Sequence, residues 1–196
     1  MSARDEILGS IRSRTRAAVP EPEPYRAPAI TSDLVAAFVA KAEAVNTEIR
    51  ILEREDEIPT VIAEILRAHN LAARIHLPPN SDVAGLDALT ILRDPPGPDD
   101  TAATYAPLAV AETGTLVQPA REASPASWHF RPGFEIAILK ASDIVAHFED
   151  ALVKLKKKNL PPTINLITGP SRTGDIEQTL ELGAHGPKAL AVLIVR

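Results

Sequence analysis

The segment from residue 163 to residue 187 constrains the fold of this chain more than any other stretch. It reads TINLITGPSRTGDIEQTLELGAHGP. The apolar run Ile164–Ile167 predicts a strand buried on both faces, and the polar stretch Thr168–Gly174 predicts a tight loop directly after it. Ligands of open α/β sheets bind beyond the carboxyl ends of strands, where the N–H groups of a helix start attract anions. The segment therefore predicts a binding site in this loop.

We expect a helix after this loop. Asp175 or Gly174 would cap its start, and Gln178 or Glu177 would reach back to the cap. Gly183 stands where a left-handed residue ends a helix, and Pro187 prevents the helix from restarting. Capping is accordingly the role expected of both acidic residues.

A second motif stands at residues 109–117, which read AVAETGTLV. One carboxylate, two hydroxyls and a glycine, at Glu112–Thr115, separate two apolar runs. This pattern is typical of a hairpin or of a strand–loop–strand unit.

Together, AETGTLV and ITGPSRTGDIEQTLELGAHGPK resemble the lactate utilization protein C family (LutC/YkgG, LUD domain). The resemblance covers about residues 105–196 and, more loosely, the N-terminal segment Arg4–Ala18. It implies a fold similar to the NagB/RpiA/CoA-transferase class. It also implies that the chain is an accessory subunit, working beside iron–sulfur proteins in the oxidation of L-lactate to pyruvate.

The charge and hydropathy of the chain exclude several classes of function. The formal net charge of −5 over 196 residues argues against nucleic acid or an anionic membrane surface as the main partner. The apolar runs are too short for a transmembrane helix, and no leader for export is evident. We therefore expect a cytoplasmic protein with no membrane span.

The absence of cysteine limits the redox chemistry that this chain can perform. Without cysteine it has no disulfide, no thiol nucleophile and no thiolate ligand for an iron–sulfur cluster. Its histidines show no metal-ligand spacing, and there is no glycine-rich dinucleotide or P-loop motif. We expect no metal or cofactor in this chain, and we expect iron–sulfur clusters only in partner proteins.

The pattern along the chain predicts an N-terminal helix with a proline-rich linker over residues 1–28, and a LUD-type α/β domain over residues 29–196. Within the domain we expect helices over 31–46, 59–69 and 143–156, and strands over 48–52, 73–77, 88–92, 135–139, 164–167 and 189–195. Strands that alternate with helices predict a three-layer, mostly parallel sheet with helices on both faces.

Glu112 is the first candidate for catalysis. A carboxylate can act as a nucleophile or general base when its surroundings tune its pKa, and CoA-transferases of the resembled fold class place a nucleophilic glutamate in a comparable loop. Thr113, Gly114 and Thr115 would then bind substrate. The alternative is a carboxylate that accepts backbone N–H groups and fixes the turn, in which case Glu112→Gln would leave any turnover unchanged.

Arg172 is the best candidate for binding an anion. Its planar guanidinium suits a carboxylate or a phosphate. The substrate-binding candidates of its loop are Gly169, Ser171, Arg172 and Thr173. The alternative is an ion pair of Arg172 with Asp175, Glu177 or Glu112 that only holds the loop.

His185 is the second candidate for catalysis, because it stands beside this loop and a histidine exchanges protons near neutral pH. The alternative is a turn histidine whose ring bonds to the backbone. In contrast, His69, His76 and His147 fit ordinary helix or strand patterns, and we expect them at the surface or its boundary.

The segment Ser127–Glu135 departs from the resembled family. The family shows a leucine–proline–proline stretch and then a histidine, whereas this chain has Arg131-Pro132-Gly133 and then Glu135. Trp128 and His129 lie in this segment, where they either line a pocket or anchor the loop.

Two further functions remain open from the sequence. The first is a stand-alone enzyme or sensor that binds an anionic metabolite such as an acyl-CoA, a sugar phosphate or a carboxylate. The second is a purely structural partner whose proposed site is an interface.

Overall fold

The computed structural model describes residues 3–13, 23, 25, 27–30, 33–122, 124–157, 160–173, 181–183 and 185–196. The helices are α1 (Ala3–Ser13), α2 (Leu34–Ala44), α3 (Ile58–Ala68), α4 (Ser127–Phe130) and α5 (Phe148–Lys156), with 3-10 turns η1 (Glu55–Glu57) and η2 (Ala141–Asp143). The strands are β1 (Glu48–Leu52), β2 (Arg74–His76), β3 (Thr90–Leu92), β4 (Thr101–Ala106), β5 (Leu108–Val110), β6 (Thr115–Pro119), β7 (Phe134–Lys140), β8 (Ile144–Val145), β9 (Ile164–Ile167), β10 (Arg172–Thr173), β11 (Glu181–Leu182) and β12 (Ala189–Val195).

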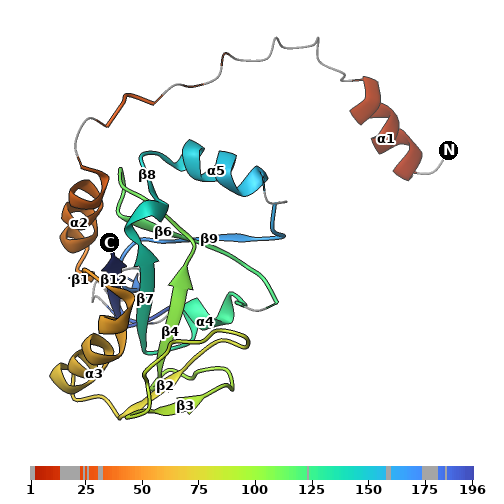
Figure 1. The fold of residues 1–196 in the computed structure, drawn as a ribbon. Helices are drawn as coiled ribbons and strands as arrows, with labels where there is room; N and C mark the ends of the chain where they lie inside the picture. The colour runs from red at the N-terminus through yellow and green to blue at the C-terminus, as the bar shows by residue number, and fades with distance from the viewer. Residues whose placement is uncertain are drawn as a thin grey trace.

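A six-stranded sheet with the order β1-β12-β7-β4-β2-β3 forms the centre of the domain (Figure 1). Every pair of neighbours in this sheet is parallel. Parallel neighbours need crossover connections, and buried parallel strands read as continuous apolar runs, as β12 does. The predicted α/β class with a mostly parallel sheet is confirmed.

The two faces of this sheet carry different helices. Successive side chains of a strand point to opposite faces, so Phe134, Ile136 and Ile138 of β7 pack in one apolar cluster with α3. Ala137 and Leu139 of the same strand pack in a second cluster with α2. The expected helices on both faces are therefore confirmed.

A second sheet with the order β8-β5-β6-β9 covers the α2 face of the first. Its β5 and β6 form an antiparallel hairpin, as the motif at 109–117 predicts. Ala109 and Leu116 of the hairpin join the cluster of α2. Val110 and Val117 point the other way and pack with Leu155 of α5. The layers thus run from α3 through the parallel sheet to α2 with the second sheet, and then to α5.

The strand predicted at 164–167 forms, but not in the parallel sheet. It is β9, which pairs antiparallel with β6 at the edge of the second sheet. The expectation that it is buried on both faces is wrong, since Leu166 is 49% exposed. An apolar run shows that a strand forms, but it does not show which sheet takes it.

The helix predicted before Gly183 also differs from the structure, because its expected last residues form a strand. Its expected start, with Asp175 and Glu177, lies outside the described residues. Glu181–Leu182 form β11, which pairs antiparallel with Arg172–Thr173 of β10. Gly183 does have the expected positive φ of 84°, but it follows a strand.

Three further points complete the comparison of the expected elements with the structure. The helix expected over 143–156 begins only at Phe148, because residues 144–145 form β8 instead. The central strand β4 was not anticipated, since its sequence TAATYA is rich in alanine and lacks the usual apolar signal. The helix expected at the N-terminus is α1, which has no buried residue and lies apart from the sheets (Figure 1). Most of the expected linker lies outside the described residues.

Two glycine turns pack against the C-terminal end of α2. Gly114 has a φ of 67°, and a Cβ there would lie 2.5 Å from the backbone nitrogen of Ala42. Gly169 has a φ of 76°, and a Cβ there would lie 2.7 Å from the carbonyl oxygen of Val45. Only glycine permits both this conformation and this closeness, so each glycine serves the approach of a helix end.

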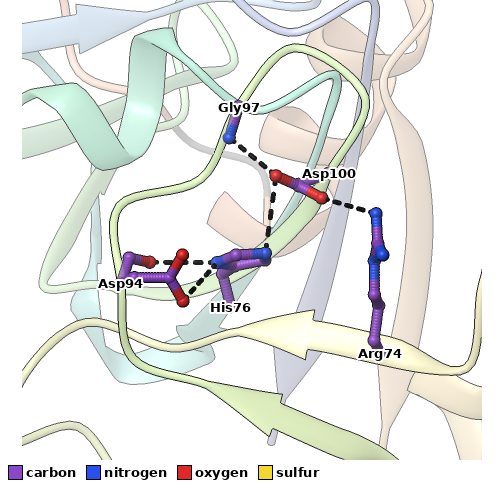
Figure 2. A network of polar contacts seen from close by, with 5 residues as sticks. All are labelled: Arg74, His76, Asp94, Gly97 and Asp100. Carbon is purple, nitrogen blue, oxygen red and sulfur yellow. Dashed lines mark hydrogen bonds and ion pairs between the residues drawn. The ribbon is translucent and has the colours of Figure 1, made fainter.

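A polar network fixes the loop between β3 and β4 (Figure 2). Asp100 accepts hydrogen bonds from Arg74 at 2.9 Å and from the backbone N–H of Gly97 at 2.8 Å. His76, which we expected at the surface or its boundary, is buried and bonds to the carbonyl oxygen of Asp94 at 2.9 Å. Its Nε2 lies 3.5 Å from Asp100.

The same loop supports the start of β7. The carbonyl oxygen of Asp100 accepts from the backbone N–H groups of Gly133 and Phe134. The hydrogen bond from Gly97 lowers the pKa of Asp100, and the nearby His76 and Arg74 lower it further against the opposing effect of burial.

Among the described residues, no helix has the length and apolar character needed to cross a membrane.

We expect Asp100→Asn to reduce the free energy of unfolding at neutral pH by about 1–2 kcal/mol, because charge-assisted hydrogen bonds are lost. A carboxyl whose native pKa is lowered stabilises the fold above its ordinary pKa, and this contribution is lost as the pH falls through the native pKa. The difference from wild type should therefore shrink below about pH 4. Urea unfolding across this range measures it, with Asp99→Asn as the control for loss of an exposed neighbouring charge.

Candidate functional site

A cavity of about 430 Å³ lies where the loop after β9 meets the segment before β12. It is lined by residues 166–172, by residues 185–187, and by Val45, His129 and Phe130. The cavity lies at the carboxyl end of β9, as the sequence predicts. With respect to the parallel sheet it lies at the amino ends of β1, β7 and β12, because β9 belongs to the other sheet.

The cavity brings together most of the candidates from the loop at 168–174. Gly169, Ser171, Arg172 and His185 all line it. Thr173 continues β10 directly after Arg172. β10 thus lies within the stretch for which a loop was predicted, and β11 occupies the expected end of the helix.

Backbone hydrogen bonds hold the two sides of the cavity together. Ser171 donates its N–H to the carbonyl oxygen of Pro187 at 2.8 Å and accepts at its own carbonyl from Gly183 at 3.2 Å. The hydroxyl of Ser171 lies 3.4 Å from the backbone N–H of His185, which donates to it. The His185 side chain is exposed, so the ring is accessible to solvent and to a ligand.

Arg172 is exposed at the cavity and contacts the side chain of Asn46, which follows α2. The amide oxygen of Asn46, when turned toward Arg172, accepts from its guanidinium. Within the described part of the chain, no carboxylate pairs with Arg172. Glu112, one of the partners considered, pairs elsewhere, and Asp175 and Glu177 lie outside the described residues.

A chain of hydroxyl groups links the two sequence motifs. The Oγ1 atoms of Thr113 and Thr115 lie 2.7 Å apart, and Thr115 lies 2.7 Å from the Oγ1 of Thr168 on the cavity wall. Thr115 is buried, so this contact joins the hairpin to the loop after β9. Glu112, Thr113, Gly114 and Thr115 do not themselves line the cavity.

Glu112 pairs with His147, a residue for which we expected no more than an ordinary surface position. Its Oε2 lies 2.9 Å from the Nδ1 of His147, the residue before α5. The side chain of His147 is 10% exposed and that of Glu112 is 47% exposed. Asp150 accepts from the backbone N–H of His147 at 3.1 Å, which fixes the start of the helix. The pair therefore ties the β5–β6 turn to α5.

The hydrogen bond to Glu112 raises the pKa of His147 above its ordinary value of 6.5. Burial opposes this, whereas the backbone of Pro28 and the charges of Glu112 and Asp150 support it. The pair thus favours the protonated form of the His147 imidazole. Sequence spacing gave no signal of it, because the partners are 35 residues apart.

A second histidine–carboxylate pair lies beside the cavity and was not anticipated either. Glu135 and His129 are 0% and 1% exposed, and the His129 Nδ1 lies 2.6 Å from the Glu135 Oε1. Thr104 of β4 donates to the same oxygen at 2.7 Å. A glutamate at a buried position of an apolar strand is the one signal that could have predicted this pair. Trp128 is buried next to it, so the segment both lines a pocket and anchors the loop.

We expect Glu112→Gln to lower the pKa of His147 toward its ordinary value, because the charged acceptor is lost. A raised native pKa stabilises the fold below the ordinary pKa, and this contribution is lost as the pH rises through the native pKa. The variant should therefore lose more thermal stability at about pH 6 than at about pH 8.5. NMR titration of His147 and melting curves measure this, with Glu122→Gln as an exposed control. An unchanged titration would show that the pair does not form.

Comparison with known proteins shows which family this part of the chain is similar to. The profile of the LUD domain matches residues 100–195, which include the hairpin, the cavity loop and β12.

Among the described residues, no cluster of three or more histidine, aspartate or glutamate side chains could hold a metal ion.

Proteins named lactate utilization protein C are similar to slightly less than half of this chain. Lactate utilization protein C of Macrococcus caseolyticus is 37% identical over 97 residues, which are 47% of this chain and 42% of the relative. Lactate utilization protein C of Anoxybacillus flavithermus is 33% identical over 92 residues, with the same shares. The aligned part therefore spans less than half the length of these relatives.

A solved structure supports the fold. A DUF162 family protein from Deinococcus radiodurans matches with a TM-score of 0.65 and 19% identity, covering 86% of this chain and all of that one. This structural match shows a shared fold, and over residues 100–195 this chain is similar to the LUD domain family.

Proposed function

We propose that this chain takes part in lactate utilization as an accessory subunit and that its cavity binds a small carboxylate. The similarity to lactate utilization protein C, and the LUD domain match over residues 100–195, support the pathway. The observation that carries the binding role is the guanidinium of Arg172 at a cavity of about 430 Å³.

The chemistry of the cavity suits a 2-hydroxy or 2-oxo acid. A planar guanidinium donates two parallel hydrogen bonds to a carboxylate. The hydroxyl of Ser171 and the ring of His185 supply polar groups for the second oxygen of such an acid. Val45, Ile167 and Pro187 supply an apolar wall for its carbon chain.

Oxidation of L-lactate to pyruvate removes two electrons, which need an acceptor. This chain contains no cysteine, and thiolates are the usual ligands of iron–sulfur clusters. We place those clusters in partner proteins of the same system, and we assign no cofactor to this chain. Its contribution would be to hold the carboxylate or to join the partners.

Growth on L-lactate as the sole carbon source tests the proposal. A strain that lacks the gene should fail to grow, and the wild-type gene should restore growth. Arg172→Ala should not restore it, because the carboxylate loses its charged partner. Arg131→Ala, which removes an exposed arginine that does not line the cavity, should restore it. Normal growth of the deletion strain would overturn the assigned pathway.

The size of the cavity favours a second candidate function, that of an enzyme or sensor for a larger anionic metabolite. A volume of about 430 Å³ falls in the range of sites that enclose drug-sized ligands and exceeds the need of a three-carbon acid. Acyl-CoA and sugar phosphates carry the anionic groups that Arg172 suits.

Calorimetry separates the two candidates. L-Lactate, pyruvate, a sugar phosphate and acetyl-CoA are each titrated into the wild-type protein, Arg172→Ala and Arg131→Ala. The ligand that binds should lose at least about tenfold in affinity in Arg172→Ala, because a charged hydrogen bond contributes about 1.5–3 kcal/mol, and should bind Arg131→Ala normally. Binding of a phosphate ester alone would favour the second function. Equal affinity of a ligand for all three proteins would exclude Arg172 as the residue that binds the anion.

A further inference from the structure

The buried pair of His129 and Glu135 has a defined proton arrangement. The Oε1 of Glu135 accepts from the hydroxyl of Thr104 at 2.7 Å and lies 2.6 Å from the Nδ1 of His129. An oxygen that already accepts one hydrogen bond, at this short distance from a ring nitrogen, calls for a proton on Nδ1. The neutral imidazole then presents a lone pair at Nε2.

The Nε2 of His129 faces a serine hydroxyl. The Oγ of Ser124 lies 3.5 Å from this nitrogen. Ser124 is held in a tight turn, since it exchanges two backbone hydrogen bonds with Arg121, at 3.2 and 3.0 Å. Ser124 is partly exposed and lines a second cavity, of about 390 Å³, which is not the cavity proposed to bind a carboxylate. Arg121 and Tyr105 line the same cavity.

Burial of Glu135 needs an explanation beyond packing. Its side chain is 0% exposed, and within the described residues its Oε2 has no hydrogen-bond partner. A buried carboxylate with an unsatisfied oxygen destabilises a fold relative to an apolar residue of the same volume. A carboxylate that orients a histidine, which in turn faces a hydroxyl, is the arrangement that activates serine nucleophiles.

We propose that Ser124, His129 and Glu135 form a nucleophilic site that cleaves an ester or thioester of an anionic acyl group. Arg121 at the cavity binds the anionic part of the acyl donor. Ser124 and His129 are the catalytic residues, and Glu135 is a positioning residue that acts through His129. Ser124 and Arg121 line a cavity other than the proposed carboxylate cavity, whereas His129 lines the carboxylate cavity. The two proposals are nevertheless tested at different residues, Ser124 for the nucleophile and Arg172 for the carboxylate, so either can fail alone.

The reaction has two balanced steps. The Oγ of Ser124 attacks the carbonyl carbon and gives its proton to the Nε2 of His129. The bond from that carbon to the alcohol or thiol breaks, and the leaving group takes the proton from His129. Water then attacks the acyl–serine ester with His129 as the base, which releases the carboxylic acid and restores the Ser124 hydroxyl. No electrons are transferred and no oxidant is needed.

The apo distance of 3.5 Å is longer than a good hydrogen bond. Catalytic hydrogen bonds of this kind shorten when a substrate is bound, so the distance fits a resting nucleophile. Because Thr104 stands on β4, Glu135 on β7 and His129 on α4, packed elements hold the base and its positioning residue. Only Ser124 lies on a loop.

The full-length protein is treated with a fluorophosphonate, which phosphonylates activated serines, and with p-nitrophenyl acetate. Intact mass should show one adduct on the wild-type protein, located at Ser124 by peptide mapping. The ester should give a burst of one equivalent of p-nitrophenol. Ser124→Ala should abolish the adduct and the burst, and Ser127→Ala, a partly exposed serine three residues away, should keep both.

Glu135→Gln tests the positioning role. It should lower the rate constant of the burst by at least about tenfold while leaving the ester concentration for half-maximal rate unchanged. A structural role alone would not separate these two quantities. Circular dichroism and melting curves establish folding, and Ser124→Ala carries the test if the buried variant fails to fold.

Absence of both adduct and burst in the folded wild-type protein would overturn the proposal. So would an adduct that persists in Ser124→Ala. A site that labels at Ser124 with equal rates in wild type and Glu135→Gln would contradict the part assigned to the carboxylate.

Discussion

The approach of two glycine turns to one helix end sets the geometry on which the cavity depends. Gly114 lies in the turn between β5 and β6, Gly169 follows β9, and each leaves no room for a Cβ against the backbone at the end of α2. Val45, at that same end, lines the cavity, and Asn46 contacts Arg172. A helix that contributes no motif residue therefore positions both motifs. Backbone-to-backbone packing of this kind tolerates little adjustment, because protein interiors are close-packed.

The elements with strong local patterns were predictable from the sequence. The strand Ala189–Val195 forms as expected because seven apolar residues in a row suit a strand covered on both faces. Helix α3 was also expected, since Ile58, Ile62, Ile65 and Leu66 share its buried face. The strand Thr101–Ala106 was not, because its burial comes from its central place in the sheet and not from its own hydropathy.

The candidate site was predictable only where one loop carries it. Ser171 and Arg172 were expected because polar residues follow a strand directly, and the loop does line a cavity. The paired histidines were not expected, because the partner of His147 comes from a hairpin 35 residues away and that of His129 from the next strand. Such pairs are created by the tertiary structure, so a single sequence contains their residues but not their contact.

The place of β12 in the sheet has a consequence for synthesis. This strand lies between β1 and β7, and among the strands that the structure describes β1 pairs with β12 alone. A ribosome delivers β1 before every other strand of the sheet and β12 after all of them. Until residues 189–195 emerge, β1 stays without a partner and β7 keeps one unpaired edge, and open strand edges bind other chains. A nascent chain that stalls before these residues would therefore need chaperones to shield it from aggregation.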